Sequence, residues 1–192
     1  MIAVNISLEW VSTKDLLPHE DIIPSIVEEN VLNIKKKQKI VPIIVDTNTN
    51  LILDGHHRYY AFIKLGIRKI PVYYVDYRSS NIIVNTWYRL IYPPLLLSLN
   101  VNGEYCVTDK GTKILCDNSL YKLYWRQNML EQILIKNGYK IIKNFKEGLY
   151  IPPLEKEYVI SIALKGLRFP PKSTRHEYKF YIAKEEIGIN EY

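Results

Sequence analysis

The first eighty residues alternate between short apolar runs and segments with helical spacing. Residues 2–10 alternate apolar and polar side chains, which predicts a strand, and residues 12–23 are typical of a loop that Pro18 interrupts. A first helix is predicted from Pro24 to residue 39, because apolar side chains recur there at helical spacing and lysines gather in its last turn. A short buried strand, a polar turn and a hairpin partner are predicted next, in "IVPIIVD" (40–46), "TNTN" (47–50) and "LILD" (51–54).

A second helix is predicted from His57 to Leu65, with Gly66 as its stop, and "KIPVYYVDY" (69–77) is typical of another strand. The order strand, helix, strand, strand, helix, strand predicts a compact α/β unit over residues 1–80. Residues 81–192 predict a smaller second part with one helix near residues 119–139 and several strands, among them "YVISIALKG" (158–166). The expected fold class is therefore α/β, in the α+β sense, with two domains at 1–80 and 81–192.

The net charge and the apolar runs of the chain limit the classes of partner that we expect. The 192 residues carry a formal net charge of +6, with a pI near 9.1, which favours an anionic partner such as a nucleotide. The basic residues are dispersed, apart from residues 35–39 and the surroundings of Lys172, which disfavours a nucleic-acid groove. The run "LIYPPLLLSLNV" (90–101) is too short to span a membrane, and the first residues do not resemble a signal peptide, so a cytoplasmic protein without a membrane partner is expected.

The two cysteines, Cys106 and Cys116, lie in a polar, turn-rich segment away from every histidine. They form no CxxC motif, which disfavours a metal or redox site. A disulfide between them is one option, but two ordinary thiols are the expected state of an intracellular chain.

Three polar stretches hold all four histidines of the chain. These stretches are "LPHED" (17–21) with His19, "DGHHR" (54–58) with His56 and His57, and "PPKSTRHE" (170–177) with His176. Residues scattered at random would seldom cluster in this way, so we expect the three stretches to meet in space.

The stretch "DGHHR" lies where a buried strand ends at Leu53 and a helix begins directly afterwards. Gly55 permits an unusual backbone angle, and the first turn of a helix offers unpaired N–H groups to a phosphate. Arg58 can bind a phosphate through two parallel hydrogen bonds, and Asp54 could hold magnesium or orient a donor. The alternative is that Asp54 caps the helix while the histidines and Arg58 form surface pairs.

The segment "ILDGHHRYYAFIKLGIRKIPVYYVDY", preceded by "VPIIVD", resembles the ParB/sulfiredoxin-like superfamily and, within it, the free serine kinase (SerK) family. The resemblance is best over residues 16–89 and returns at "FPPKSTRH" (169–176). Sulfiredoxins place a reactive cysteine in this loop, where the present chain has Gly, His and His at 55–57. Chromosome-partition ParB proteins have a "GERR"-like version followed by a helix-turn-helix DNA reader, which is not evident after residue 80.

The resemblance implies transfer of a phosphoryl group from ADP or ATP, with Mg²⁺, to the hydroxyl of free L-serine, giving O-phospho-L-serine for serine or cysteine metabolism. It implies that Glu20 is the catalytic base and that Asp54 is a catalytic acid and a candidate magnesium ligand. It also implies a phosphate-binding loop at Gly55, His56, His57 and Arg58, and substrate-contacting residues at Trp87, Ser173, Thr174, Arg175 and His176, with Lys172 beside them. We expect the active site in a cleft between the two domains. The composition is typical of a heat-adapted source, which favours ADP as the phosphoryl donor.

Each residue also has a simpler interpretation: a solvated loop acid for Glu20, a core aromatic for Trp87 and a solvent-facing charge for Lys172, Arg175 or His176. The main alternative function is a non-catalytic ParB-like regulator that binds a nucleotide or DNA. A metal site made of the four histidines ranks last, because adjacent His56 and His57 are awkward joint ligands. The oligomeric state stays open.

Overall fold

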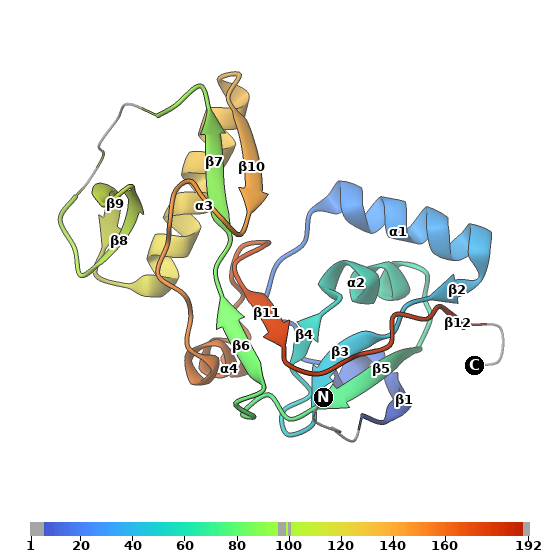
Figure 1. The fold of residues 1–192 in the computed structure, drawn as a ribbon. Helices are drawn as coiled ribbons and strands as arrows, with labels where there is room; N and C mark the ends of the chain where they lie inside the picture. Colours follow the sequence, from blue (N-terminus) through green and yellow to red (C-terminus); the bar gives the residue numbers. More distant parts are fainter. Residues whose placement is uncertain (1–5, 96–98, 100, 190–192) are drawn as a thin grey trace. The chain divides into compact units, whose positions relative to one another are not determined.

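The computed structural model describes residues 6–95, 99 and 101–189 (Figure 1). Its helices and strands, in chain order, are β1 (Leu8–Ser12), the short 3₁₀ helix η1 (Thr13–Asp15), α1 (Pro24–Lys37), β2 (Lys39–Ile40), β3 (Ile43–Asp46), β4 (Ile52–Asp54), α2 (His56–Lys64), β5 (Lys69–Val75), β6 (Ile82–Asn85), β7 (Tyr88–Tyr92), β8 (Tyr105–Asp109), β9 (Thr112–Asp117), α3 (Leu120–Lys136), β10 (Lys140–Asn144), α4 (Lys156–Leu164), β11 (Arg175–Tyr178) and β12 (Ile187–Gly188). This mixture of helices and small sheets confirms the predicted α+β class.

The chain forms two compact units. The first unit contains Met1–Ile83, Glu155–Pro171 and His176–Tyr192, and the second contains Val84–Leu154 and Lys172–Arg175. The sequence predicted a single division near residue 80. The chain instead passes between the units four times, because two segments from its C-terminal part pack with the first eighty residues.

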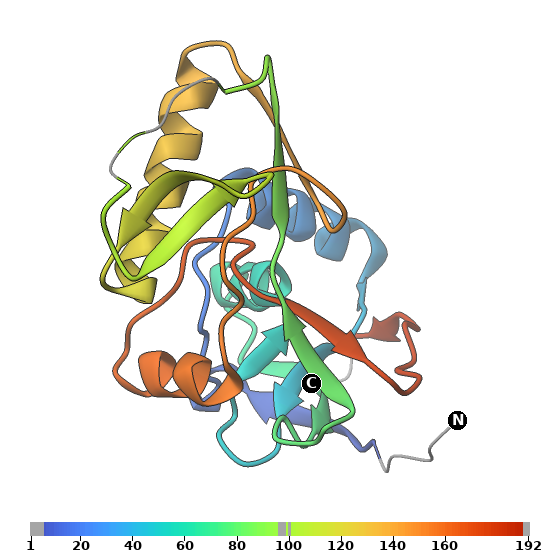
Figure 2. The same ribbon diagram turned by 60° about the vertical axis from the view of Figure 1, so that its left-hand side comes forward.

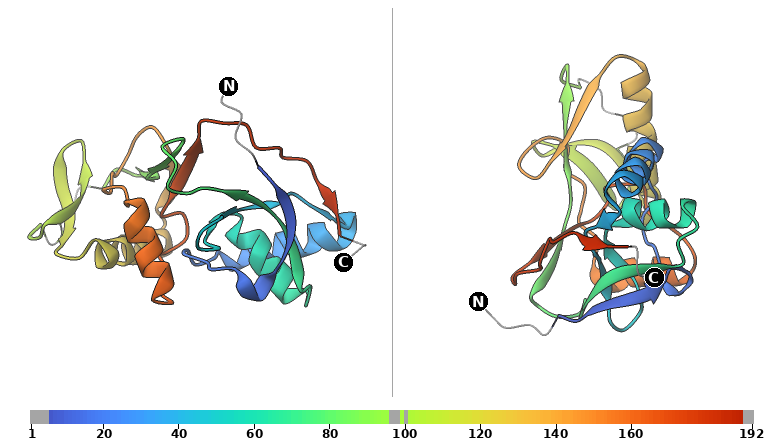
Figure 3. Two further views of the ribbon diagram at one scale, coloured as in Figure 1. Left: turned by 90° about the horizontal axis from the view of Figure 1, so that it is seen from below. Right: turned by 90° about the vertical axis from the view of Figure 1, so that its right-hand side faces the viewer.

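The first unit is built on a four-stranded sheet in the order β1-β5-β3-β4. Strand β3 runs parallel to β5, whereas β1 is antiparallel to β5 and β4 is antiparallel to β3 (Figure 3). The predicted hairpin of residues 40–54 is confirmed as β3, a turn and β4. The described part of the predicted first strand is β1, which continues to Ser12, while residues 2–5 of that prediction lie outside the described residues.

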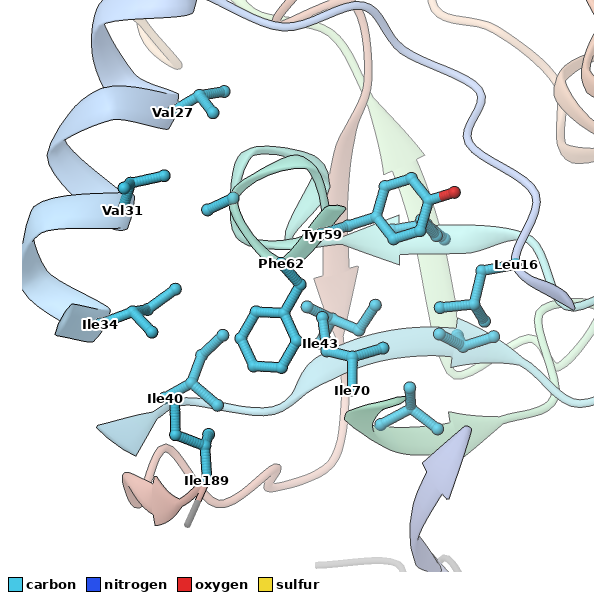
Figure 4. Close-up of a cluster of buried hydrophobic side chains, with 14 residues drawn as sticks. Leu16, Val27, Val31, Ile34, Ile40, Ile43, Tyr59, Phe62, Ile70 and Ile189 are labelled. Atoms are coloured by element: carbon cyan, nitrogen blue, oxygen red, sulfur yellow. The ribbon is translucent and has the colours of Figure 1, made fainter. Parts of the chain in front are cut away.

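Helices α1 and α2 supply the apolar side of this unit. Val27, Val31 and Ile34 lie four and three residues apart on α1, so they share one face, and Figure 4 shows them pointing toward α2. Phe62 of α2 is fully buried between that face and the strands. Burial of each such side chain contributes about 1.5–3 kcal/mol, which fixes α2, and with it the end of β4, against the sheet.

The C-terminal residues complete the same core. Strand β12 pairs antiparallel with β2, and Ile189 joins the buried cluster beside Ile40 (Figure 4). Phe169, which follows α4, is also fully buried in the first unit.

The second unit combines two antiparallel strand pairs with helix α3. Strands β7 and β10 are antiparallel, with Ile91 opposite Ile141, and β8 pairs with β9 next to α3 (Figure 2). Helix α3 begins after Ser119, whose side chain accepts a hydrogen bond from the Lys122 N–H, and it ends before Gly138 as predicted.

Two expectations from the sequence are wrong. Residues 158–164 of the strand predicted at 158–166 lie in helix α4, because the buried Val159, Ile160, Ile162 and Ala163 follow helical spacing. Cys106 and Cys116 form a disulfide rather than two thiols, since they face one another across β8 and β9. None of the described helices is long and apolar enough to cross a membrane.

Candidate functional site

The junction of β4 and α2 presents a helix start that no side chain caps. Asp54 ends β4, Gly55 takes the N-cap position at φ +105°, and α2 begins at His56. A Cβ atom at residue 55 would lie 2.8 Å from Cβ of Ile43, so the close approach of the two strands as well as the backbone angle requires glycine. With no side-chain cap, the first N–H groups of α2 form an anion seat of the kind that phosphates occupy.

Arg58 holds this junction together from the first turn of α2. Its Nη1 atom donates to the carbonyl oxygens of Val41 and Pro42, each at 2.8 Å, and its Nη2 atom donates to Oδ2 of Asp54 at 3.0 Å. The Asp54 side chain remains 61% exposed. Asp54 therefore does not cap α2, and the surface pair with Arg58 that the simpler interpretation expected is present.

The loop that carries Glu20 is hydrogen-bonded along its backbone to two neighbouring segments. The Leu17 N–H donates to the Asn50 carbonyl in the turn before β4, and the Ile52 N–H at the start of β4 donates to the Leu17 carbonyl, each at 2.9 Å. On the other side, the Phe169 N–H donates to the His19 carbonyl and the Asp21 N–H donates to the Phe169 carbonyl, each at 2.8 Å.

Two histidine side chains of α2 complete the hold on this loop. The His19 N–H donates to Nε2 of His56 at 3.3 Å, and the Ile23 N–H donates to Nε2 of His57 at 3.0 Å. The Glu20 residue between these two contacts is only 7% exposed, which removes the interpretation of a solvated loop acid. Its Oε1 atom lies 3.8 Å from Nε2 of His19.

The three polar stretches meet through their histidines. The His19 ring lies 4.6 Å from the His56 ring and 5.8 Å from the His176 ring, measured between centroids. Nε2 of His176 lies 3.0 Å from the hydroxyl of Tyr77, and Nδ1 of His19 lies 2.7 Å from the Ile52 carbonyl. The expected convergence in space is therefore observed, and it takes place within the first unit.

Burial keeps this cluster neutral. Desolvation lowers the pKa of His19, although the charge of Glu20 opposes the shift, and it lowers the pKa of His56 well below its usual value. The pKa of His176 falls to about 3, first because of burial and then because of the neighbouring His19. Burial raises the pKa of Tyr77, and the charge of Glu20 raises it further, so this phenol keeps its proton beside His176.

The remaining predicted residues gather in the second unit. Nε1 of Trp87 donates to the Thr174 carbonyl at 2.9 Å, and Nζ of Lys172 lies 5.3 Å from the centre of the Trp87 ring. The Arg175 guanidinium lies 4.4 Å from the centre of the Phe145 ring. Ser173 and Thr174 are buried. Trp87 and residues 172–175 therefore form one cluster, while His176 belongs to the histidines of the first unit.

A buried arginine that sequence reasoning missed holds that second cluster in place. Arg89 donates from Nε to Oε1 of Glu131 at 2.8 Å, and both side chains are at most 5% exposed. It also donates to the Trp87 carbonyl and, at 3.1 Å, to the Lys172 carbonyl. No local signal marks Arg89, because its partners lie on α3 and in the segment after Pro171.

Among the described residues, no group of three or more His, Cys, Asp or Glu side chains is placed to hold a metal ion. The histidine rings instead bind backbone groups and Tyr77. Magnesium needs less from the protein, because it is often held by one or two carboxylates together with nucleotide phosphates. The exposed carboxylate of Asp54, beside the start of α2, fits that requirement.

Comparison with known proteins finds relatives along nearly the whole chain, although no protein-family model matches. A ParB-like protein of Sulfolobus acidocaldarius is 47% identical, over 95% of this chain and 96% of the relative. An ATP-dependent L-serine kinase of Staphylothermus marinus is 29% identical, over 84% of this chain and 81% of the relative. The ADP-dependent L-serine kinase SerK of Thermococcus kodakarensis is 27% identical, over 95% and 91%.

Solved structures share the fold. A free serine kinase in complex with AMP superposes with a TM-score of 0.80 at 18% identity, over 96% of this chain and 92% of that one. A C-terminally truncated SbnI of Staphylococcus aureus gives a TM-score of 0.73 at 16% identity, over 95% and 87%.

Proposed function

We propose that this chain, which belongs to the free L-serine kinase (SerK) family of the ParB/sulfiredoxin-like superfamily, transfers a phosphoryl group from ADP or ATP to the hydroxyl of free L-serine. The observation that carries the proposal is the buried side chain of Glu20, which lies in a loop whose backbone N–H groups at His19 and Ile23 are bound by the two histidine side chains that open α2. A base and an anion seat are thereby fixed to one another within a single unit.

Glu20 is the general base of this reaction. Its carboxylate takes the proton of the serine hydroxyl while the serine oxygen forms a bond to phosphorus. The bond from phosphorus to the departing phosphate oxygen breaks, and the nucleotide leaves as AMP from ADP or as ADP from ATP. A positioned base of this kind typically contributes roughly 10²- to 10⁴-fold to the rate.

The start of α2 holds the phosphates. The N–H groups of the first turn, together with the backbone of Gly55, which carries no side chain, receive the phosphate oxygens, and Arg58 adds positive charge beside them. Phosphoryl transfer depends mainly on positioning and on neutralising charge, which a bound Mg²⁺ would supply. Asp54 would hold that ion or act as an acid, because its carboxylate is exposed next to the seat.

Trp87 and the segment 172–175 contact the amino acid. The hydrogen bond from Nε1 of Trp87 to the Thr174 carbonyl ties the indole to this segment, in which Ser173 and Thr174 are buried and Arg175 is the next residue. His176 contributes from the histidine cluster of the first unit. We favour ADP as the donor, and the product phosphoserine would feed serine or cysteine metabolism.

The test is incubation with L-serine, Mg²⁺ and either ADP or ATP, followed by mass spectrometry of the amino acid. We expect phosphoserine from the natural protein and a loss of roughly 10²- to 10⁴-fold in the Glu20→Gln variant, with nucleotide binding retained in calorimetry. Asp21→Asn is the matched control, since it removes the neighbouring but half-exposed carboxylate.

Near-normal turnover by Glu20→Gln would remove the base assignment. A protein that leaves serine unchanged but binds DNA with a steep dependence on salt would instead be the ParB-like regulator.

A further inference from the structure

Two adjacent histidines accept hydrogen bonds from the backbone on either side of Glu20. Nε2 of His56 receives the N–H of the residue before Glu20, and Nε2 of His57 receives the N–H of Ile23, three residues after it. An imidazole nitrogen that accepts a hydrogen bond carries no proton, so both rings are neutral and protonated on Nδ1 while these contacts exist.

We propose that His56 and His57 are positioning residues, whose side chains hold the Glu20 loop in place instead of donating to phosphate. The inference rests on the proposed function, because it assigns Glu20 as the base that the loop presents. Different atoms of His56 and His57 then have different roles. Their backbone N–H groups belong to the anion seat, and their ring Nε2 atoms bind the loop.

The backbone around Glu20 needs such a hold because no helix or regular strand supports it. Among the described residues, isolated strand-like bridges tie the backbone of this loop to Leu51 and to Phe169. These bridges use the backbone of Leu17, His19 and Asp21. The N–H groups of His19 and Ile23 are left for the two imidazoles, and the contact of Ile23 also fixes the residue that precedes α1.

The same helical turn thus serves two partners. A phosphate bound at the first N–H groups of α2 and the loop bound at the ring nitrogens are attached to the same two residues. A bound nucleotide therefore lies at a fixed offset from the base, which is the relation that proton abstraction requires. A ring whose Nε2 accepts from the backbone cannot donate from that atom to a phosphate oxygen.

The side chain of His57 provides the cleaner test, and two substitutions separate the roles. Glutamine can place an acceptor oxygen near the position of Nε2, whereas leucine keeps the bulk and removes the acceptor. We expect His57→Leu to lower kcat at least tenfold with the KM for nucleotide changed less than twofold, and His57→Gln to recover most of that loss. A side chain that binds phosphate would raise the KM for nucleotide in His57→Leu, and this result would overturn the proposal.

A second measurement does not depend on turnover. In ¹⁵N-labelled protein, a scalar coupling across the hydrogen bond should join the Ile23 amide to Nε2 of His57. The Ile23 amide should exchange with solvent faster in His57→Leu than in His57→Gln.

The two readouts keep the two ideas apart. If the natural protein makes no phosphoserine but shows the coupling, the proposed function fails while the contact between His57 and the loop stands. If phosphoserine forms and the coupling is absent, or His57→Leu keeps its kcat, the positioning role fails and the kinase assignment stands.

Discussion

At the scale of single residues, Gly55 carries the strictest requirement near the proposed site. Its φ of +105° disfavours any side chain, and an added Cβ would collide with the side chain of Ile43. Gly66 has a similar backbone angle, φ +71°, but nothing lies within 4 Å of its missing Cβ. Substitutions at Gly55 and Gly66 therefore distinguish the effect of backbone strain alone from that of strain combined with a steric collision.

We expect Gly55→Ala to lower the free energy of unfolding by about 2–4 kcal/mol, because left-handed strain adds to overpacking. Gly66→Ala should lose only about 1–2 kcal/mol, from strain alone. Urea unfolding of both variants measures the difference. Equal losses in the two variants would mean that contact with Ile43 does not constrain the junction.

At the scale of elements, the buried ion pair of Arg89 and Glu131 ties β7 to α3. Without Arg89, the buried Glu131 carboxylate keeps its ion pair with Lys143 at 3.0 Å but loses the hydrogen bond from the guanidinium, and the loss of one partner from a buried pair costs up to about 3–5 kcal/mol. We expect Arg89→Met to lose stability on that scale, and the double variant with Glu131→Leu to regain part of it. Arg78→Ala is the control, because Arg78 and Glu157 form an exposed pair whose loss should change little.

Urea unfolding of the single and double variants supplies this comparison. If Arg89→Met lowered the free energy of unfolding as little as Arg78→Ala, Arg89 would not stabilise the second unit. Because Arg89 also binds the carbonyls of Trp87 and Lys172, the same variant should weaken serine binding.

The hairpin of β8 and β9 carries the disulfide, and its contribution to stability follows from the chain that it closes. Cys106 and Cys116 are separated by 10 positions, and a cross-link over so short a loop contributes up to about 3 kcal/mol through the unfolded chain. We expect a reducing agent to lower the melting temperature of the natural protein. The double variant Cys106→Ser with Cys116→Ser should have a lower melting temperature than the natural protein, and this temperature should not change when the reductant is added. If the reductant still lowered the melting temperature of the double variant, the disulfide would not be the cause of the effect.

At the scale of the whole molecule, the histidine cluster links segments far apart in the sequence, and it makes stability depend on pH. The folded protein lowers the pKa of His19, His56 and His176 below the value of about 6.5 in an unfolded chain. This stabilising contribution is therefore fully present above pH ~6.5 and is lost as the pH falls toward the folded pKa, which for His176 is about 3.

We expect the free energy of unfolding to fall between pH 7 and pH 5, by up to about 1.4 kcal/mol per pH unit for each ring. Most carboxyl groups titrate below this window, so the histidines dominate it. Urea unfolding at several pH values measures how steeply the free energy of unfolding depends on pH. In His176→Gln this dependence should be shallower, because unfolding takes up one proton fewer. A slope that is flat or of opposite sign would mean that the rings are not held neutral.

Local patterns allowed much of the first unit to be predicted from the sequence. Helices α1 and α2 and the hairpin of β3 and β4 were recognised because apolar spacing and breaking residues determine them locally. Residues 158–166 were misinterpreted because Ile160, Ser161 and Ile162 alternate like a strand, whereas the residues around them bury a helical face.

The contacts among the candidate site residues were predicted unevenly for a related physical reason. Motifs and the grouping of histidines brought out Glu20 and the loop after Asp54, since these groups lie in short stretches. Arg89, Tyr77 and Phe169 were missed because each acts through partners that only the folded chain brings near. Pairing of the two cysteines likewise depends on the register of β8 and β9, which composition does not reveal.

The first unit draws on widely separated parts of the chain: Phe169 supports the Glu20 loop, His176 enters the histidine cluster and Ile189 closes the apolar core. During translation, these contributors leave the ribosome long after α1 and α2 have been made. A nascent chain therefore cannot assemble the proposed base and anion seat early, and premature termination before residue 169 would yield a product that lacks part of this proposed site.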